Sequence, residues 1–187
     1  MPELSGLTIA NIPCKPKVAG VKKVWAVDCT KMDIVVTQGT LKAEVSDYTI
    51  ENLDDLVQME FTKNKTAFLT MTQSSKNSSV DYTLQIPYEA ITPEILYVLN
   101  TMRTTCCFGL VVELNSGQII VLGWDYDWDT DTITTIDDPI QLKGSVASGT
   151  GNGDSELTTF EFVGQGKSFP LTTSLVAADF DDTTGHD

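Results

Sequence analysis

Acidic and aromatic residues alternate along one short stretch of this chain, and both types can do chemistry. The alternating residues are Trp124, Asp125, Tyr126, Asp127, Trp128, Asp129 and, after Thr130, Asp131. An extended backbone has a period of two residues, so it would place the carboxylates on one face and the rings on the other. Carboxylates arranged in this way can bind a hard cation, act as an acid–base pair or repel another anion.

The spacing of Asp125, Asp127 and Asp129 resembles the ligand positions of a calcium-binding loop. Such a loop needs Gly at its sixth position and a bidentate Glu at its twelfth. Counted from Asp125 these positions hold Thr130 and Ile136, and counted from Asp127 they hold Thr132 and Asp138. The pattern therefore predicts no metal site, and we assign the carboxylates to a surface that faces solvent or a neighbouring subunit.

Other residues of the types used in catalysis do not form a recognisable set. A glycosidase pair needs one carboxyl in an apolar pocket, whereas these acids lie in polar turns and alternating positions. Residues 164–168 lack the spacing of a phosphate-binding loop, and Phe169 stands where its helix should begin. The single histidine, His186, leaves no material for the common His-dependent triads. We predict a protein that is not an enzyme and that holds no cofactor or metal.

Charge is distributed unevenly along the chain, whose net charge is −14. Residues 1–40 contain five lysines against three acids, whereas residues 113–187 contain fourteen acids against two lysines. A surface that binds nucleic acid needs clustered Lys and Arg, which this composition does not supply. The asymmetry favours head-to-tail stacking of identical subunits, because complementary patches fix register. Ordinary solubilising charge is the alternative explanation.

The cysteines and apolar runs indicate where the protein is made. Cys14, Cys29, Cys106 and Cys107 include no CxxC pair, and we predict four free thiols. The longest apolar runs are far shorter than the roughly 20 residues that span a bilayer, and the N-terminus lacks a signal-peptide pattern. We expect a soluble protein made inside the cell.

The elements that position these residues are expected to be mainly strands. Apolar alternation predicts strands over residues 22–28, 32–36, 81–87 and 157–163, with meandering strands between 41 and 69. Asn115-Ser116-Gly117 predicts a hairpin between residues 111–114 and 118–122. Residues 132–136 are expected to pair with 139–144, and residues 164–166 to form a turn. Thr92 as N-cap and Pro93 in the first turn predict one helix, over residues 93–103.

Length and pattern together predict a single domain over residues 1–187. Its class is mainly β: a β-sandwich or barrel-like subunit with one flanking helix and a long central hairpin. We expect a flexible N-terminal segment over about residues 1–20, a mobile Gly/Ser-rich loop over about 145–155 and a frayed acidic tail over about 177–187.

The order of these features resembles that of tail-tube and related ring-forming virion proteins of tailed bacteriophages. The features are the helix over 93–103, then CFGLVVELNSGQIIVLGWDYD, then ELTTFEFVGQGKSFPL, over about the last two-thirds of the chain. The resemblance implies a β-sandwich subunit that assembles into stacked rings, often hexameric. Hairpins from neighbouring subunits would form a continuous inner barrel through which the genome passes.

This resemblance also implies partners and sites. The partners are further copies of the chain and other tail or neck proteins of the virion, assembled in the host cytoplasm; the genome passes without specific binding, and no membrane takes part. A carboxylate-lined bore would repel phosphates. The expected lumen-facing residues are Asp125, Asp127, Asp129 and Asp131. The expected ring-stacking residues are Lys15, Lys17, Lys22 and Lys23.

Two alternative functions use the same residues differently. One is a capsid decoration protein or a neck (head-completion) protein, which would present a similar sandwich on another surface of the virion. The other is a carbohydrate- or calcium-binding β-sandwich module, for which the aromatic face and the acidic loop would be the site.

Overall fold

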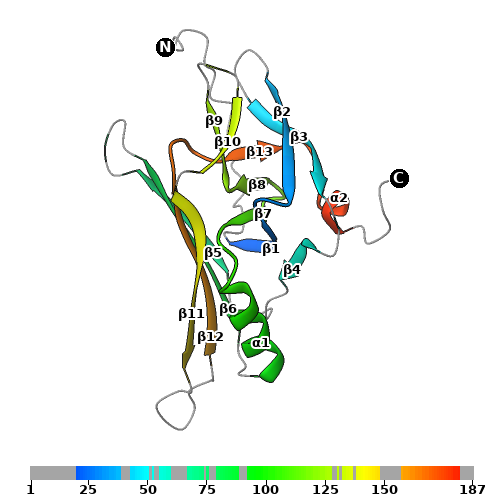
Figure 1. Ribbon diagram of the computed structural model, residues 1–187. Helices are drawn as coiled ribbons and strands as arrows, with labels where there is room; N and C mark the ends of the chain where they lie inside the picture. The colour runs from blue at the N-terminus through cyan, green and yellow to red at the C-terminus, as the bar shows by residue number, and fades with distance from the viewer. Residues whose placement is uncertain are drawn as a thin grey trace.

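The computed structural model describes residues 20–38, 43–50, 52, 55–59, 67–73, 75, 79–88, 92–127, 130, 132–136, 138–147 and 157–181. Within these residues the chain forms thirteen strands and two helices. The strands make a curled seven-stranded sheet, a four-stranded sheet and a two-stranded ribbon (Figure 1). The prediction of a mainly β, sandwich or barrel-like fold is confirmed.

The seven-stranded sheet has the order β2-β3-β13-β8-β7-β1-β4. Its strands are β1 Val21–Asp28, β2 Met32–Gln38, β3 Ala43–Ile50, β4 Val57–Met59, β7 Phe108–Leu114, β8 Ile119–Leu122 and β13 Leu171–Thr173. Neighbouring strands are antiparallel except for β13 and β3, which run parallel.

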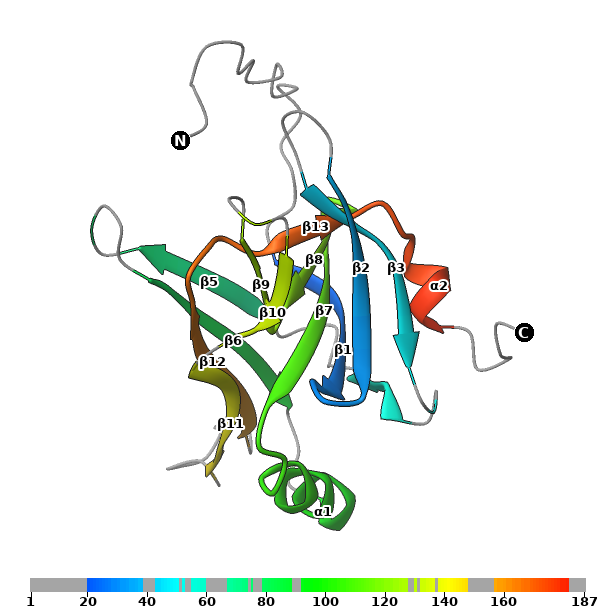
Figure 2. The same ribbon diagram turned by 45° about the horizontal axis from the view of Figure 1, so that its top comes forward.

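The four-stranded sheet has the order β11-β12-β6-β5 and runs along one side of the molecule (Figures 1 and 2). Its strands are β5 Phe68–Gln73, β6 Val80–Tyr88, β11 Asp138–Ala147 and β12 Leu157–Gly166, and every neighbouring pair is antiparallel. The two-stranded ribbon consists of β9 Trp124–Asp127 and β10 Thr132–Thr135.

The main core lies between the four-stranded and the seven-stranded sheets. The strand predicted over 81–87 is confirmed as β6, and its alternating residues Tyr82, Leu84 and Ile86 are all buried. They pack in one cluster with Phe160 and Phe162 of β12. Residues of β1, β7 and β8 complete this cluster, among them Val24, Ala26, Leu110, Val112 and Leu122.

A second core covers the opposite face of the seven-stranded sheet. Trp25 and Val111 lie in this cluster together with Trp124 and Tyr126 of β9. Phe180, from the short helix α2 Ala177–Asp181, is buried here and its ring lies 5.5 Å from that of Trp25. The predicted frayed tail is therefore wrong for residues 177–181, because Phe180 anchors them. Residues 182–187 lie outside the described part.

Helix α1, Pro93–Met102, forms where the sequence predicts it. The Thr92 hydroxyl accepts a hydrogen bond from the amide of Ile95, which satisfies one of the free donors at the helix start. Ile95, Leu99 and Met102 face the main core. Gly144 of β11 makes room for this contact, since a Cβ there would lie 2.5 Å from a methyl carbon of Leu99.

The central hairpin is confirmed over β7 and β8, whereas the alternating residues from Trp124 onward form a separate strand, β9. Gly117 adopts φ +82° in its turn. The outgoing strand stops at Gly123, whose φ of +109° redirects the chain out of the sheet into β9. A Cβ at Gly123 would lie 2.8 Å from the carbonyl oxygen of Phe108. Gly123 is therefore the residue from which the end of β8 could have been predicted in the sequence.

Two predictions about strand pairing are wrong. Residues 132–136 do not pair with 139–144: β10 pairs with β9, and β11 pairs with β12. Residues 164–166 are not a turn, because they continue β12 and pair with Tyr82, Asp81 and Val80 of β6. The first error came from assuming that segments close in sequence pair with each other, and the second from reading the two glycines, Gly164 and Gly166, as a turn signal. Residues 1–19 and most of the Gly/Ser-rich loop lie outside the described residues.

Candidate functional site: the open face and edges of the four-stranded sheet

The four-stranded sheet has one buried face and one open face. Along β6 the inward residues alternate with Asp81, Thr83 and Gln85, which lie on the open side. Along β12 the buried Phe160 and Phe162 alternate in the same way with Glu161 and Val163. The period of two residues thus separates a core face from a polar face over the whole sheet.

Amides and hydroxyls dominate the open face. One row across the four strands consists of Gln141, Val163, Thr83 and Thr70. The next row consists of Lys143, Glu161, Gln85 and Phe68. At the far end of the sheet, the side-chain amide of Gln165 donates a hydrogen bond to Asp81 over 2.5 Å. The open face therefore carries few charges, and both signs occur on it.

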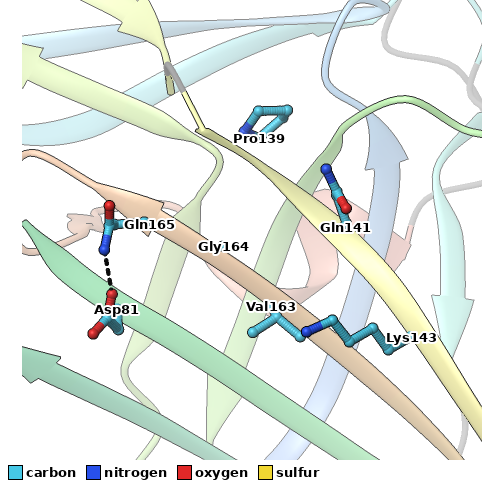
Figure 3. Close-up of a pocket in the computed structure, with 7 residues that line it drawn as sticks. All are labelled: Asp81, Pro139, Gln141, Lys143, Val163, Gly164 and Gln165. Atoms are coloured by element: carbon cyan, nitrogen blue, oxygen red, sulfur yellow. Dashed lines mark hydrogen bonds between the residues drawn. The ribbon is translucent and has the colours of Figure 1, made fainter.

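A hollow of about 260 Å³ lies on this face between β11 and β12 (Figure 3). Its lining residues are Asp81, Pro139, Gln141, Lys143, Val163, Gly164 and Gln165. Gly164 has no room for a side chain, since a Cβ would lie 2.8 Å from the Cα of Ile140. The pairing of β11 with β12 also shifts register between Asp138 and Gln141. Gly164 thus lets β11 approach β12 closely on the core side, next to the register shift that borders the hollow.

Both edges of the four-stranded sheet lack a partner strand among the described residues. The edge strands are β11, of ten residues, and β5, of six. Because four antiparallel strands alternate in direction, β11 and β5 run in opposite directions. Long unpaired edges are a liability that proteins usually shield or use for association. Phe68, which is 45% exposed, lies on the β5 edge, and its side chain is on the open face of the sheet.

Asp125 does not face a lumen, and this prediction is wrong. Its side chain is buried, with 4% exposure, and both carboxylate oxygens accept hydrogen bonds from the amide of Lys167, at 3.2 and 3.1 Å. The hydroxyl of Tyr82 donates to the carbonyl oxygen of Ser168. Burial, with a smaller effect from the charge of Asp125, raises the pKa of Tyr82 above its usual value. These contacts join β9 to β6 and to the end of β12.

The remaining predicted lumen residues are placed differently. Asp127 is exposed, and its carboxylate accepts a hydrogen bond from the amide of Thr130 at 3.4 Å. Asp129 and Asp131 lie outside the described residues. The expected aromatic binding face is also absent from β9, because Trp124 and Tyr126 are buried in the second core. The carbohydrate-binding hypothesis thereby loses these two rings as its site.

The predicted stacking lysines fall into two pairs. Lys15 and Lys17 lie outside the described residues. The ammonium of Lys22 lies 2.5 Å from the buried carboxylate of Glu113, so this lysine has a role within the subunit. Lys23 lies over the ring of Trp25, with its Nζ 5.5 Å from the ring centroid. Lys22 and Lys23 thus make contacts within the subunit at the start of β1. Contact of the four lysines with a neighbouring ring stays a prediction.

The prediction of four free thiols is wrong for two of them. Cys29 and Cys107 form a disulfide, with their Cα atoms 5.7 Å apart, and Cys106 is free and exposed. The pairing of β1 with β7 brings the two cysteines together, which their separation of 78 residues concealed. Asp28, Cys29 and Cys107 are also the one cluster of metal-ligating types found within the described ranges. The two sulfur atoms cannot act as thiolate ligands while they are bonded to each other.

Two further findings concern the whole chain. Among the described residues, neither helix has the length and apolar character needed to cross a membrane. Comparison of the chain with protein-family models, with curated proteins and with solved structures gave no match in any of the three.

Proposed function

We propose that this chain is a structural subunit that assembles with copies of itself into closed rings, and that the rings stack into a tail tube of a bacteriophage virion. The observation that carries the proposal is the pair of oppositely directed edges of the four-stranded sheet, neither of which has a partner strand among the described residues. The phage tail is the setting implied by the order of the helix, the central hairpin and the late strand. In that setting the subunit is not an enzyme, and its partners are its own copies and other tail or neck proteins.

The strand directions allow the sheet to continue from one copy to the next. If β5 of one copy pairs with β11 of its neighbour, the new pair is antiparallel, as are all pairs within the sheet. Rotation about one axis repeats the same contact until the ring closes, and closure removes every exposed edge of this sheet. Six copies of four strands, at about 4.8 Å spacing and about 40° tilt, give a barrel roughly 48 Å across between backbones.

The open face of the sheet would line the bore of such a barrel, because the core face is covered. This assignment replaces Asp125 with a lining of Thr83, Gln85, Gln141 and their neighbours in the cross-strand rows. Amides and hydroxyls with few cations give phosphates no cluster of positive charge to bind. The net charge of −14 adds a general repulsion between the subunit and DNA. The genome would therefore pass without specific binding.

The disulfide is compatible with a protein that acts outside the cell. Disulfides persist at virion surfaces and in other oxidising environments, whereas the cytoplasm keeps thiols reduced. The Cys29–Cys107 bond would then form after assembly, when the virion leaves its host.

Ring formation is tested by sedimentation and negative-stain microscopy of the purified chain and of two edge variants. Phe68→Lys places a charge on the β5 edge, where it should abolish rings and leave a folded monomer. Val35→Lys is the matched control, because Val35 is 49% exposed on β2, the edge strand of the other sheet, and rings should persist. A wild-type chain that stays monomeric at every concentration would overturn the proposal. Equal ring formation by Phe68→Lys would overturn closure through β5.

A further inference from the structure

Three residues of metal-ligating types meet where β1 ends and β7 begins. Asp28 is the last residue of β1, Cys29 follows it, and Cys107 directly precedes β7. One carboxylate oxygen of Asp28 and the two sulfur atoms all lie within 4.8 Å of one another. The sulfur atoms form a disulfide in the structure, and reduction of that bond leaves two thiols beside a carboxylate.

The backbone holds these residues together independently of the disulfide. Asp28 pairs with Phe108 in the β1–β7 ladder, and the amide of Cys29 donates a hydrogen bond to the carbonyl oxygen of Cys107 over 3.4 Å. The amide of Lys31 donates to the carbonyl oxygen of Asp28 over 2.9 Å, in the turn that leads to β2. Strand pairing and this turn therefore keep the two cysteines adjacent when the bond between them is reduced.

The carboxylate of Asp28 is oriented by hydrogen bonds of its own. Its Oδ1 accepts from the amide of Thr30 at 3.0 Å and from the Thr30 hydroxyl at 2.7 Å. Carboxylates that bind metals are in turn hydrogen-bonded, which fixes the direction of their lone pairs. A disulfide needs no carboxylate beside it, so Asp28 is the residue that distinguishes a metal site from a plain cysteine pair.

The chemistry of the three ligands favours zinc. Thiolates bind soft and borderline ions and a carboxylate binds hard ones, and Zn²⁺ accepts both, at about 2.3 Å from sulfur and about 2.1 Å from oxygen. Tetrahedral bonds of this length place the two sulfur atoms about 3.8 Å apart. The Cα atoms of Cys29 and Cys107 are 5.7 Å apart, so rotation of a cysteine side chain about its Cα–Cβ bond opens this distance without moving the backbone.

The surroundings leave one side of the cluster accessible. Cys29 and Cys107 are buried, whereas Asp28 is half-buried. Cys106 is exposed and is not part of the cluster. The site thus has three protein ligands, and a water molecule would complete a tetrahedral zinc ion from the side of Asp28.

We propose that the reduced chain binds one Zn²⁺ through the Sγ atoms of Cys29 and Cys107 and a carboxylate oxygen of Asp28. Binding of the ion releases the two thiol protons. A low-molecular-weight disulfide such as oxidised glutathione then converts the site. It takes two electrons from the two thiolates and splits into two thiolates of its own, while the Cys29–Cys107 bond forms and Zn²⁺ leaves.

The same two cysteines would thus join β1 to β7 through a metal ion in a reducing cell and through a covalent bond in an oxidising environment. This inference goes beyond the proposed function and does not require rings. Its failure and the failure of ring formation are therefore distinguishable.

The test uses the full chain with Cys14→Ser and Cys106→Ser, which leaves Cys29 and Cys107 as its only cysteines. After anaerobic reduction and removal of the reductant, Co²⁺ serves as the spectroscopic probe. One Co²⁺ per chain should produce thiolate-to-cobalt charge-transfer absorption, and Zn²⁺ should displace it. The oxidised chain, and the reduced chain that also carries Cys107→Ser, should lose this absorption. A reduced chain without it would overturn the inference.

Asp28→Asn tests the third ligand, because the amide keeps an oxygen for the bonds from Thr30 and loses the negative charge. Asp33→Asn removes the same charge at an exposed position on β2 and is the matched control. Asp28→Asn should weaken zinc binding at least about 10-fold, the lower end of the loss seen when groups that orient a ligand are removed. Equal zinc affinity in the two variants would overturn the proposed site.

Circular dichroism of the same reduced chain controls for folding. Zinc should raise the midpoint of thermal unfolding, because it binds the folded chain. If the reduced chain is unfolded without metal, zinc should restore its β-sheet spectrum, since binding energy then becomes folding energy. A spectrum and a midpoint that zinc leaves unchanged would overturn the inference.

Discussion

The carboxylate of Asp125 is a buried hydrogen-bond acceptor that holds β9 against the end of β12. Both of its oxygens accept a hydrogen bond from the amide of Lys167. The hydroxyl of Tyr82, on β6, lies close enough to interact electrostatically with the Asp125 carboxylate. Gly166 leaves space for this arrangement, because a Cβ there would lie 2.9 Å from Asp125 Oδ1. An acid that sequence alternation assigns to an open surface thus has a structural role.

Replacing Asp125 tests this role. Asp125→Ala removes the buried carboxylate that accepts the amide of Lys167, and it should lower the free energy of unfolding by about 1–3 kcal/mol. Asp127→Ala on the same strand is exposed and should change it by less than about 0.5 kcal/mol. Urea unfolding followed by tryptophan fluorescence measures both. Equal effects of the two substitutions would contradict the assignment.

At the level of elements, Gly117 and Gly123 stand at the two ends of β8, where the backbone changes direction. Both have positive φ, and they differ in the space around them. A Cβ at Gly117 meets nothing within 4 Å, whereas one at Gly123 meets the backbone of Phe108 and Gly109. The first glycine closes a hairpin, and the second ends β8 and starts β9.

Alanine at these two glycines should separate conformational strain from steric overlap. Gly117→Ala should cost about 1 kcal/mol, the lower end of the range for a non-Gly residue with positive φ. Gly123→Ala should cost about 3 kcal/mol or more, because the backbone around it must also shift. The midpoints of urea unfolding give the comparison. If Gly117→Ala proved the more damaging, the placement of the β8–β9 break would be wrong.

The disulfide connects two elements that are distant in sequence, the end of β1 and the segment before β7. Its sequence separation of 78 residues gives a chain-entropy stabilisation of about 4.5 kcal/mol, so Cys29→Ser should lower the unfolding free energy by up to this amount without reductant. Cys106→Ser should have little effect, because that thiol is free and exposed. With reductant present, the wild type should approach the Cys29→Ser variant. Titration of Cys29 by a thiol reagent in the folded, oxidised protein would contradict the bond.

For the whole molecule, the subunit is strongly acidic, whereas the face proposed to line the bore carries few charges. Wild-type rings should therefore show no binding to duplex DNA even near 10 mM salt, where electrostatic attraction is least screened. Thr83→Lys/Gln85→Lys adds two cations per copy to the open face, and the rings should then bind DNA with an affinity that falls steeply as salt rises.

Fluorescence anisotropy with a labelled duplex measures this binding. Lysines placed instead at Val35 and Thr37 on β2 also add two cations per copy, away from the open face, and they serve as the control for net charge. Similar DNA binding by both pairs would show that the open face does not line the bore.

Much of the local structure could be predicted from the sequence because short-range patterns encode it. The alternation in β6, the Thr92-Pro93 start of α1 and the Gly117 turn each depend on residues within one element. The candidate site was harder to predict. Asp81, Gln141 and Gln165 have no pattern of their own, and only the order β11-β12-β6-β5 brings them to one face.

The sequence by itself determined most of the strands, where α1 begins and that the chain is strongly acidic. Only the tertiary structure decided that Asp125 is buried, that Cys29 meets Cys107 and that β11 pairs with β12 rather than with β10. The physical reason is that a period of two residues defines two faces of a strand without specifying what covers either one. For β9, other elements cover both faces of Trp124–Tyr126, whereas for the four-stranded sheet one face is left open.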